Sequence, residues 1–455
     1  MMDQQKENKM GYMPMWQLIV SMSLPMVIAM LVQACYNIVD SIYISRYSDA
    51  ALAAVSYAFP AQNLMIGCAT GIGVGVNSLL SRSLGEKNYK RANRCAGNGL
   101  ILALFGYLIF LVFGLFFAGW FISFQTRTAD IIECGREYLS VCCVFSFGIF
   151  GEILFERLMQ ATGRTLLTMF TQGIGAIVNI VLDPVFIFGY FGLPAMGAKG
   201  AAIATVLGQI IAFIIAAILN HTKNLEVKLT RDAFHLERDI VGRILEVGIP
   251  SILMVGIGSL MTTGMNKILN KFSDLAVTVF GVYFKLQSFA FMPVFGLNNG
   301  VIPVIAFNYG AGHKKRMISA VKIACIIATG FMCIGLIIMQ IFPAQALLLF
   351  DANEEMLSIG VPALRTISLS FIFAGVCIAL SSVFQALGHG KYSAIVSAAR
   401  QLLILLPVAY LFSLTGKLEL VWLSFPIAEL MSITVSLALY IRIYKKVIKC
   451  LPDRD

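Results

Sequence analysis

The chain has 455 residues, of which 58% are hydrophobic and 13% are charged, whereas soluble globular chains average roughly 45–50% and 25%. This composition excludes an ordinary soluble protein and indicates a chain embedded largely in a membrane. Twelve spans of about 25 residues would occupy roughly 300 positions, so the length fits a polytopic helical bundle and excludes a bitopic receptor. The formal charge of +10 comes from short basic clusters between apolar runs, which favours membrane topology over nucleic-acid binding.

Apolar runs separated by polar breaks predict an all-α polytopic membrane protein with twelve transmembrane helices. Their expected limits are 15–46, 51–81, 96–120, 132–162, 165–190, 198–220, 243–271, 276–308, 318–342, 355–387, 393–414 and 418–441. We expect two six-helix bundles, at 15–220 and 243–441, with a cytoplasmic linker at 221–242 and cytoplasmic tails at 1–14 and 442–455.

The distribution of Lys and Arg predicts the orientation. With the N-terminus inside, the segments on the cytoplasmic side, including the tails, hold 23 of the 34 basic residues, whereas the outer segments hold about five. Basic residues concentrate in cytoplasmic loops. Both termini are therefore expected in the cytoplasm, which requires an even number of spans.

The two halves of the sequence repeat each other at an offset of 225 positions. Pro25 aligns with Pro250, Gly85 with Gly310, and Gln160-Ala161 with Gln385-Ala386. Because each half holds an even number of spans, both halves face the same way and are related by a pseudo-two-fold axis along the membrane normal. Parallel repeats of this kind occur in secondary transporters with a central cavity between the halves.

No catalytic signature is present in the sequence. Walker A, HExxH, GxSxG and paired CxxC motifs are all absent, so we expect neither an enzyme nor an ATP-driven pump, and no cofactor. Gly71, Gly73 and Gly75 could suggest a nucleotide loop, but they lie in an apolar helix and two of them recur in the second half. They indicate close helix packing.

A set of oxygen-bearing side chains predicts an ion site in the first bundle. A charge at the bilayer centre costs about 2.5–3.5 kcal/mol on insertion scales, so buried acids need an explanation. Asp40, Asp183 and Thr205 all lie roughly 10 Å below the outer surface, counting 1.5 Å per residue. Asn179 precedes Asp183 by four residues and shares its helix face. These groups could bind Na⁺ or share a proton, or could form an inert polar network.

These residues also resemble a known family. Pro25 and Asp40, the Asn179-x-x-x-Asp183-Pro184 motif, the run from Gly200 to Thr205 and the matched halves resemble the multidrug and toxic compound extrusion (MATE) family over essentially the whole chain. The resemblance implies a cation site at Asp40, Asn179, Asp183 and Thr205, and a bend of the first helix near Pro25.

The sequence departs from the family pattern at two places. The connection between Asp183 and Thr205 is longer than usual because of residues 190–196, and Met265 occupies the repeat partner of Asp40. Beyond their first four residues, which include Glu246 and Glu355, the seventh and tenth predicted helices contain no acid. We therefore do not expect the cation site that some family members have in the second bundle.

Further residues within the spans are candidates for substrate contact. Glu152 and Glu156 share a helix face near the cytoplasmic side, where they could contact a cationic substrate, take part in a proton step, or pair with Arg157. The predicted cleft residues are Met261, Met265, Phe291 and Met292, because the helices that carry them are expected to line the interface between the bundles. The charges without like-charged repeat partners are Lys285, Arg365, Arg400 and Glu429. We interpret these as structural pairs, with Glu429 as the expected counterion.

The resemblance implies a cation-coupled antiporter, driven by H⁺ or Na⁺, that exports drugs and organic cations across the cytoplasmic membrane by alternating access. We expect a monomer that contacts membrane lipids and small-molecule drugs. One alternative is a lipid-linked oligosaccharide flippase of the same wider superfamily, although such proteins usually have a strongly basic cavity. A second is a channel or a non-transporting receptor, which the paired acids and the repeat disfavour.

Overall fold

The computed structural model describes residues 8–350 and 352–452, and all regular structure in them is helical. The first half contains α1 (Lys9–Tyr12), α2 (Met15–Tyr47), α3 (Asp49–Gly85), α4 (Tyr89–Phe116), α5 (Ala118–Ser123), α6 (Ala129–Val144), α7 (Phe147–Ala161), α8 (Thr165–Phe188), η1 (Tyr190–Gly192) and α9 (Ala198–Lys223). The linker contains η2 (Arg231–Phe234). The second half contains α10 (Arg238–Leu269), α11 (Asp274–Ala311), α12 (Lys314–Ile341), α13 (Pro343–Leu348), α14 (Glu354–Ser368), α15 (Phe371–Ala386), α16 (Gly390–Ala398), η3 (Ala399–Leu405), α17 (Leu406–Ser413), α18 (Leu418–Trp422), α19 (Ser424–Ile443) and η4 (Tyr444–Ile448).

The number of spans agrees with the prediction. Among the described residues, ten helical segments are long and apolar enough to cross a membrane, and the number rises to twelve when each of two bent pairs counts as one span. The chain is therefore a multi-pass, all-α membrane protein. Lys6 and Arg454, two of the basic residues that we assigned to the cytoplasm, lie outside the described residues.

Two predicted helices are broken, where the sequence suggested continuous spans. The span 132–162 divides into α6 and α7, bent by 44°, and the span 355–387 divides into α14 and α15, bent by 48°. At the first break the Ser146 hydroxyl donates to the Cys143 carbonyl at 2.7 Å, and at the second the Ser370 hydroxyl donates to the Ile367 carbonyl at 2.6 Å. Side chains that insert into the main-chain hydrogen-bond ladder are a common cause of such bends.

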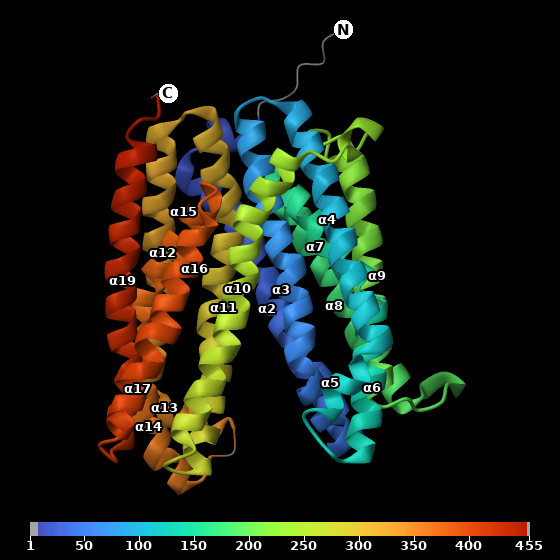
Figure 1. Ribbon diagram of the computed structural model, residues 1–455, viewed down its shortest axis with the longest axis vertical. Helices are drawn as coiled ribbons and strands as arrows, with labels where there is room; N and C mark the ends of the chain where they lie inside the picture. The colour runs from blue at the N-terminus through green and yellow to red at the C-terminus, as the bar shows by residue number, and fades with distance from the viewer. Residues whose placement is uncertain (1–7, 351, 453–455) are drawn as a thin grey trace.

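The two halves form separate bundles that meet near the end of the molecule where both termini lie and diverge toward the opposite end (Figure 1). At the seam, α3 packs against α10 and α11, and α2 packs against α11. The apolar window of α3 is 78% buried, which identifies α3 as a central helix. Its contacts with α10 run from Gly67, which lies against Val255, to Gly75, which lies against Ile244.

Glycines make the close approach at this seam possible. A Cβ on Gly71 would lie 2.7 Å from the carbonyl oxygen of Gly248, and one on Gly85 would collide with the carbonyl of Phe307. Gly310, the repeat partner of Gly85, lies in the same way against the carbonyl of Arg82. Close helix packing, the interpretation favoured for Gly71 and its neighbours, is therefore confirmed.

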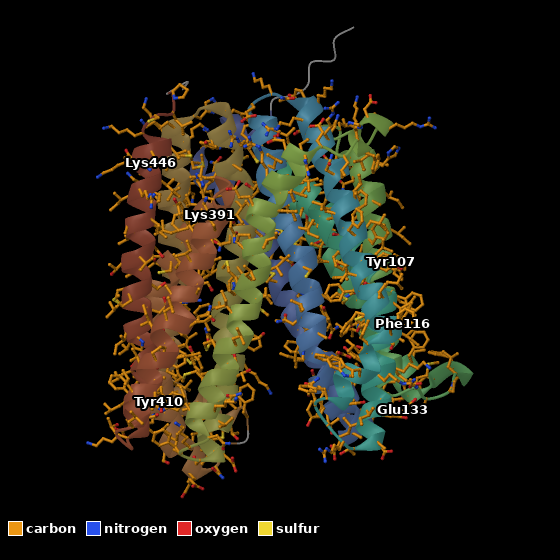
Figure 2. All side chains as sticks on the ribbon, viewed as in Figure 1. Tyr107, Phe116, Glu133, Lys391, Tyr410 and Lys446 are labelled. Carbon is orange, nitrogen blue, oxygen red and sulfur yellow. The ribbon has the colours of Figure 1, made fainter. Side chains whose placement is uncertain are left out.

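The side chains divide into charged ends and an apolar flank (Figure 2). Lys446 lies toward the end that holds the termini and Glu133 lies toward the opposite end. Phe116, on the outer side of α4, is 74% exposed. Large apolar side chains that are exposed along helices of this length are typical of a surface that contacts lipid.

Candidate functional site

The predicted ion-site residues of α8 and α9 lie within hydrogen-bond distance of one another. Asn179 Nδ2 donates to Asp183 Oδ1 at 3.2 Å and to Thr205 Oγ1 at 3.3 Å. Asp183 is fully buried and Asn179 is 3% exposed. The longer connection at 190–196 therefore does not remove Thr205 from the cluster.

Asp40 approaches the same cluster from α2, which packs against α8. No hydrogen bond among the described residues joins Asp40 to Asn179, Asp183 or Thr205, but the charges of Asp40 and Asp183 are close enough to interact. The cluster thus draws on three helices, α2, α8 and α9.

Several oxygen atoms in this cluster lack a donor. Over the described part of the chain, no hydrogen-bond partner reaches Asp40 Oδ1, Asn179 Oδ1 or Asp183 Oδ2, although all three atoms are buried. A buried polar atom left unsatisfied costs about 1–3 kcal/mol. Three such acceptors in one cluster form an arrangement that a cation or a proton would satisfy.

Tyr36 lies beside the cluster of Asp40, Asn179, Asp183 and Thr205, although it was not among the predicted site residues. It lies on α2 one helical turn before Asp40, and its phenol group is near enough to the carboxylates of Glu152, Asp40 and Asp183 for their charges to influence it. The spacing of four residues from Asp40 was the available signal, since it places both side chains on one helix face.

Pro25, the predicted bend, lies inside α2, which is described as one helix from Met15 to Tyr47. A proline has no N–H to donate to the carbonyl four residues earlier. That carbonyl, of Ser21, accepts instead from the Thr165 hydroxyl at 3.3 Å. The first turn of α8 thus compensates for the proline in α2.

Glu152 and Glu156 form a second acidic pair on α7, and both are buried. Glu156 accepts from Thr171 Oγ1 at 2.9 Å and from Gln172 Nε2 at 2.7 Å. Glu152 Oε2 is buried without a hydrogen-bond partner among the described residues. Glu156 therefore has neutral partners, and part of Glu152 remains unsatisfied.

Arg157, the basic partner that the sequence offered as one alternative, forms no direct ion pair with these acids among the described residues, although its charge interacts with that of Glu156. Its Nη1 donates to Gln160 Oε1 at 2.8 Å and to Asn299 Oδ1 at 2.9 Å. Within the described part of the chain, no ion pair joins Arg157 to Glu152 or Glu156. Since Asn299 lies on α11, Arg157 connects the two bundles instead.

The predicted cleft residues lie mostly within the second bundle. Met265 is fully buried, and Met261 and Phe291 are each 8% exposed. Phe291 packs edge-on against Phe371, with ring centroids 5.3 Å apart, and Met292 is half-buried. Their role in substrate contact remains a prediction.

The expected ion pair of the second bundle is present. Arg400 Nη1 and Glu429 Oε1 are 2.8 Å apart, and Arg400 projects from the π-helical segment η3. Lys285 and Arg365, which the sequence also placed in spans, are exposed. Because Arg400 and Glu429 balance each other's charge, these two fit the structural role that we predicted, whereas Lys285 and Arg365 form no ion pair within 4.0 Å among the described residues.

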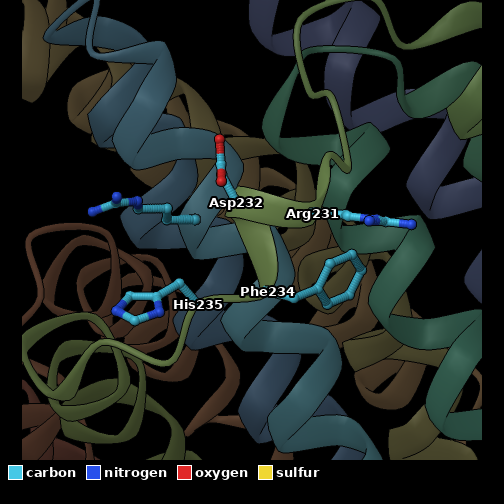
Figure 3. Close-up of a pocket in the computed structure, with 5 residues that line it drawn as sticks. Arg231, Asp232, Phe234 and His235 are labelled. Atoms are coloured by element: carbon cyan, nitrogen blue, oxygen red, sulfur yellow. The ribbon is translucent and has the colours of Figure 1, made fainter.

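A surface hollow of about 500 Å³ lies over the linker and is lined by Arg94, Arg231, Asp232, Phe234 and His235. The labelled side chains point in different directions and do not converge on one point (Figure 3). None of the predicted site residues lines it. Over the described ranges, no group of three or more His, Cys, Asp or Glu side chains is arranged to hold a metal ion.

Comparison with known proteins agrees with this architecture. Multidrug export protein MepA of Staphylococcus aureus (strain MSSA476) is 25% identical over 410 residues, covering 89% of each chain. The MepA protein of Staphylococcus haemolyticus (strain JCSC1435) is 24% identical over 421 residues, covering 92% of this chain and 91% of that protein.

Solved structures agree over a larger part of the chain. A crystal structure of MATE in the straight conformation has a TM-score of 0.91 at 27% identity, covering 98% of this chain and 99% of the other. An outward-facing multidrug resistance MATE family transporter of the MOP superfamily has a TM-score of 0.90 at 26% identity, with the same coverage. The sequence profile of the MatE family matches residues 25–185 and 250–411, one segment in each half. With two repeats matched in sequence and the whole fold matched in space, this chain belongs to the MatE family of transporters.

Proposed function

We propose that this protein exports drugs and organic cations across the cytoplasmic membrane in exchange for H⁺ or Na⁺. The observation that supports this proposal is the set of unsatisfied acceptor oxygens on Asp40, Asn179 and Asp183. Two carboxylates and an amide that each have one oxygen without a donor favour a cationic occupant, which would supply the missing electrostatic partner. The MepA relatives are multidrug export proteins, which agrees with the proposed direction of transport.

The charges in the spans favour a cationic substrate over an anionic one. Glu152 and Glu156 have no basic partner within 4.0 Å among the described residues, whereas Arg400 is paired with Glu429 and Arg157 is engaged by amides. A cation is attracted to buried acids that form no ion pair, although the charge of Arg157 opposes that attraction at Glu156. Nothing in this arrangement favours the strongly basic cavity of a lipid-linked oligosaccharide flippase.

We place the end that carries both termini in the cytoplasm, on the basis of the basic residues in its loops. The bundles are packed together at that end and diverge at the other (Figure 1), so this conformation is outward-open in the proposed orientation. Transport would then require the bundles 15–220 and 243–441 to rock about the seam, with the linker 221–242 joining them.

Coupling follows from where the two acidic pairs lie. A cation from outside would neutralise the pair Asp40 and Asp183, bend α2 near Pro25, and lower the affinity for drug. Glu156, one helix away and bonded to Thr171 and Gln172, would contact the cationic drug. Drug release and cation uptake would thereby be linked thermodynamically.

Transport in proteoliposomes would test the proposal. With the purified protein, Na⁺ and pH gradients would be imposed separately and the movement of a fluorescent organic cation followed. Export driven by one of the two gradients, with drug-dependent flux of the same ion, would support the antiporter. Flux of an ion that is independent of drug would indicate a channel, and no effect of either gradient on drug movement would refute ion coupling.

A further inference from the structure

The short segment ahead of the first span joins the two bundles. We call residues 8–13, which include α1, the N-terminal latch. On the side of the first bundle, Asn8 Nδ2 donates to the carbonyl of Thr162 at 3.1 Å. It also donates to Glu226 Oε2 at 2.8 Å and to Glu226 Oε1 at 3.1 Å. Thr162 lies at the end of α7 in the first bundle, and Glu226 lies at the start of the linker, shortly after α9.

The same segment is bound by the second bundle. Asn308 Nδ2, on α11, donates to the Met10 carbonyl at 3.2 Å. Arg316 Nη2, on α12, donates to the Met10 carbonyl at 3.2 Å and to the Met13 carbonyl at 2.8 Å. The side chain of Met10 is fully buried, and Gly11 lies against the ring of Phe307. The latch is thus a packed element of the seam.

The latch is attached to both bundles, so its bonds oppose a separation of the bundles. The latch continues directly into α2 of the first bundle, yet the carbonyls of Met10 and Met13 accept hydrogen bonds from side chains of the second bundle. It lies at the end where the bundles meet (Figure 1). If the bundles separate at this end, the bonds on one side of the latch must break, because a six-residue segment cannot follow both bundles.

We propose that the N-terminal latch holds this end of the transporter closed and sets the population of outward-open over inward-open molecules. The inference rests on the alternating access proposed above and adds a conformational device to it. The bonds of the latch involve none of the ion-site residues, so the latch acts on the conformational equilibrium without changing the ion ligands.

Cysteine cross-linking at the opposite end would test the latch. Ser45 and Asn270 lie near the far ends of α2 and α10 and are exposed, so cysteines there approach each other when the latch end opens. The exposed native thiols Cys35 and Cys450 would be replaced by serine, and the rate of disulfide formation measured in membranes.

Three variants separate the latch from simpler explanations. Asn8→Ala removes the bonds to Thr162 and Glu226, and Arg316→Met removes the two bonds that Arg316 donates to the Met10 and Met13 carbonyls, leaving the one from Asn308. Asn8→Asp retains an acceptor for the Met10 N–H, which Asn8 Oδ1 now caps at 2.9 Å, but loses its donors and repels Glu226. As a matched control, Asn93→Ala removes an acceptor for the Lys228 N–H, a contact between α4 and the linker that does not involve the latch.

We expect each latch variant to accelerate cross-linking about fivefold or more, the change in population that the loss of one ordinary hydrogen bond produces, and the control to leave it unchanged. Equal rates in wild type and all latch variants would overturn the proposal. If cross-linking is faster in Asn8→Ala but not in Asn8→Asp, the effect comes from the loss of the helix cap. If it is equally faster in the control variant, the effect is a general loosening of the structure. Either result also overturns the proposal. If no cross-link forms in any variant, the proposed rocking of the bundles is refuted, and the proposed latch is refuted with it.

Discussion

Replacing Asp183 by asparagine is expected to abolish ion-coupled export while leaving the first bundle folded. The amide side chain introduced by Asp183→Asn has the same shape as the carboxylate that it replaces. With its oxygen turned toward Asn179, it still accepts the hydrogen bond that Asp183 Oδ1 accepts at 3.2 Å. The variant therefore loses one negative charge and no hydrogen bond. Asp40→Asn should act in the same way from the neighbouring helix.

The size of the effect follows from the electrostatics of the site. Two unit charges about 4 Å apart interact by about 4 kcal/mol at an effective dielectric constant of about 20. Every 1.4 kcal/mol changes an equilibrium constant by about tenfold. Asp183→Asn should accordingly weaken binding of a monovalent cation by about two to three orders of magnitude, so that no coupling remains at ordinary ion concentrations.

Dye efflux from cells and ion binding by the purified protein would measure both parts of this prediction. Thermal unfolding in detergent checks that the fold is retained. Asp130→Asn is a suitable control, because Asp130 is an exposed carboxylate of the same bundle, in the first turn of α6. Normal efflux by either Asp183→Asn or Asp40→Asn would refute the assignment of the ion site.

Three further predictions test other parts of the account. Glu156→Gln should weaken cationic drugs more than neutral ones, because only a cation loses an attraction, while ion binding measured without drug persists; equal weakening of all drugs would instead assign Glu156 to the scaffold. In sealed cells, an impermeant maleimide should label Thr128→Cys but not Lys87→Cys, and external labelling at Lys87→Cys would refute the orientation. Burial lowers the pKa of His389 below its usual 6.5, although the charge of Glu246 opposes the shift. The folded protein therefore resists protonation there and should lose stability as the pH falls below about 6.5. His389→Gln should remove this part of the acid dependence of the unfolding temperature, and an unchanged dependence would show that His389 does not contribute.

Hydropathy and the internal repeat were sufficient to predict the twelve spans and the matched halves, whereas the family followed from the resemblance of motifs such as Asn179-x-x-x-Asp183-Pro184. A helix that crosses a membrane must be long, apolar and satisfied in its own hydrogen bonds, so composition alone identifies it. The partner of Arg400 was also predictable, because a buried charge needs a counterion and Glu429 was an available acid in the same half. Asn179 and Asp183 were predictable as neighbours for a similarly local reason, since they are one helical turn apart.

Other features depend on contacts between helices, which no local pattern contains. The breaks at Ser146 and Ser370 contain no proline, so no strong sign of them is present in the sequence. Arg157 follows Glu156 directly in sequence, yet it bonds to Asn299 on the other bundle, because successive residues on a helix point in different directions. The sequence by itself determined which segments are long and apolar enough to cross a membrane, since this follows from the free energy of transfer into lipid. It did not determine which polar groups of those segments are buried, because Lys285 and Arg365 are exposed. Only the tertiary structure decided which of those groups meet, and that residues 8–13 bridge the two bundles, because such contacts depend on how the helices pack in space.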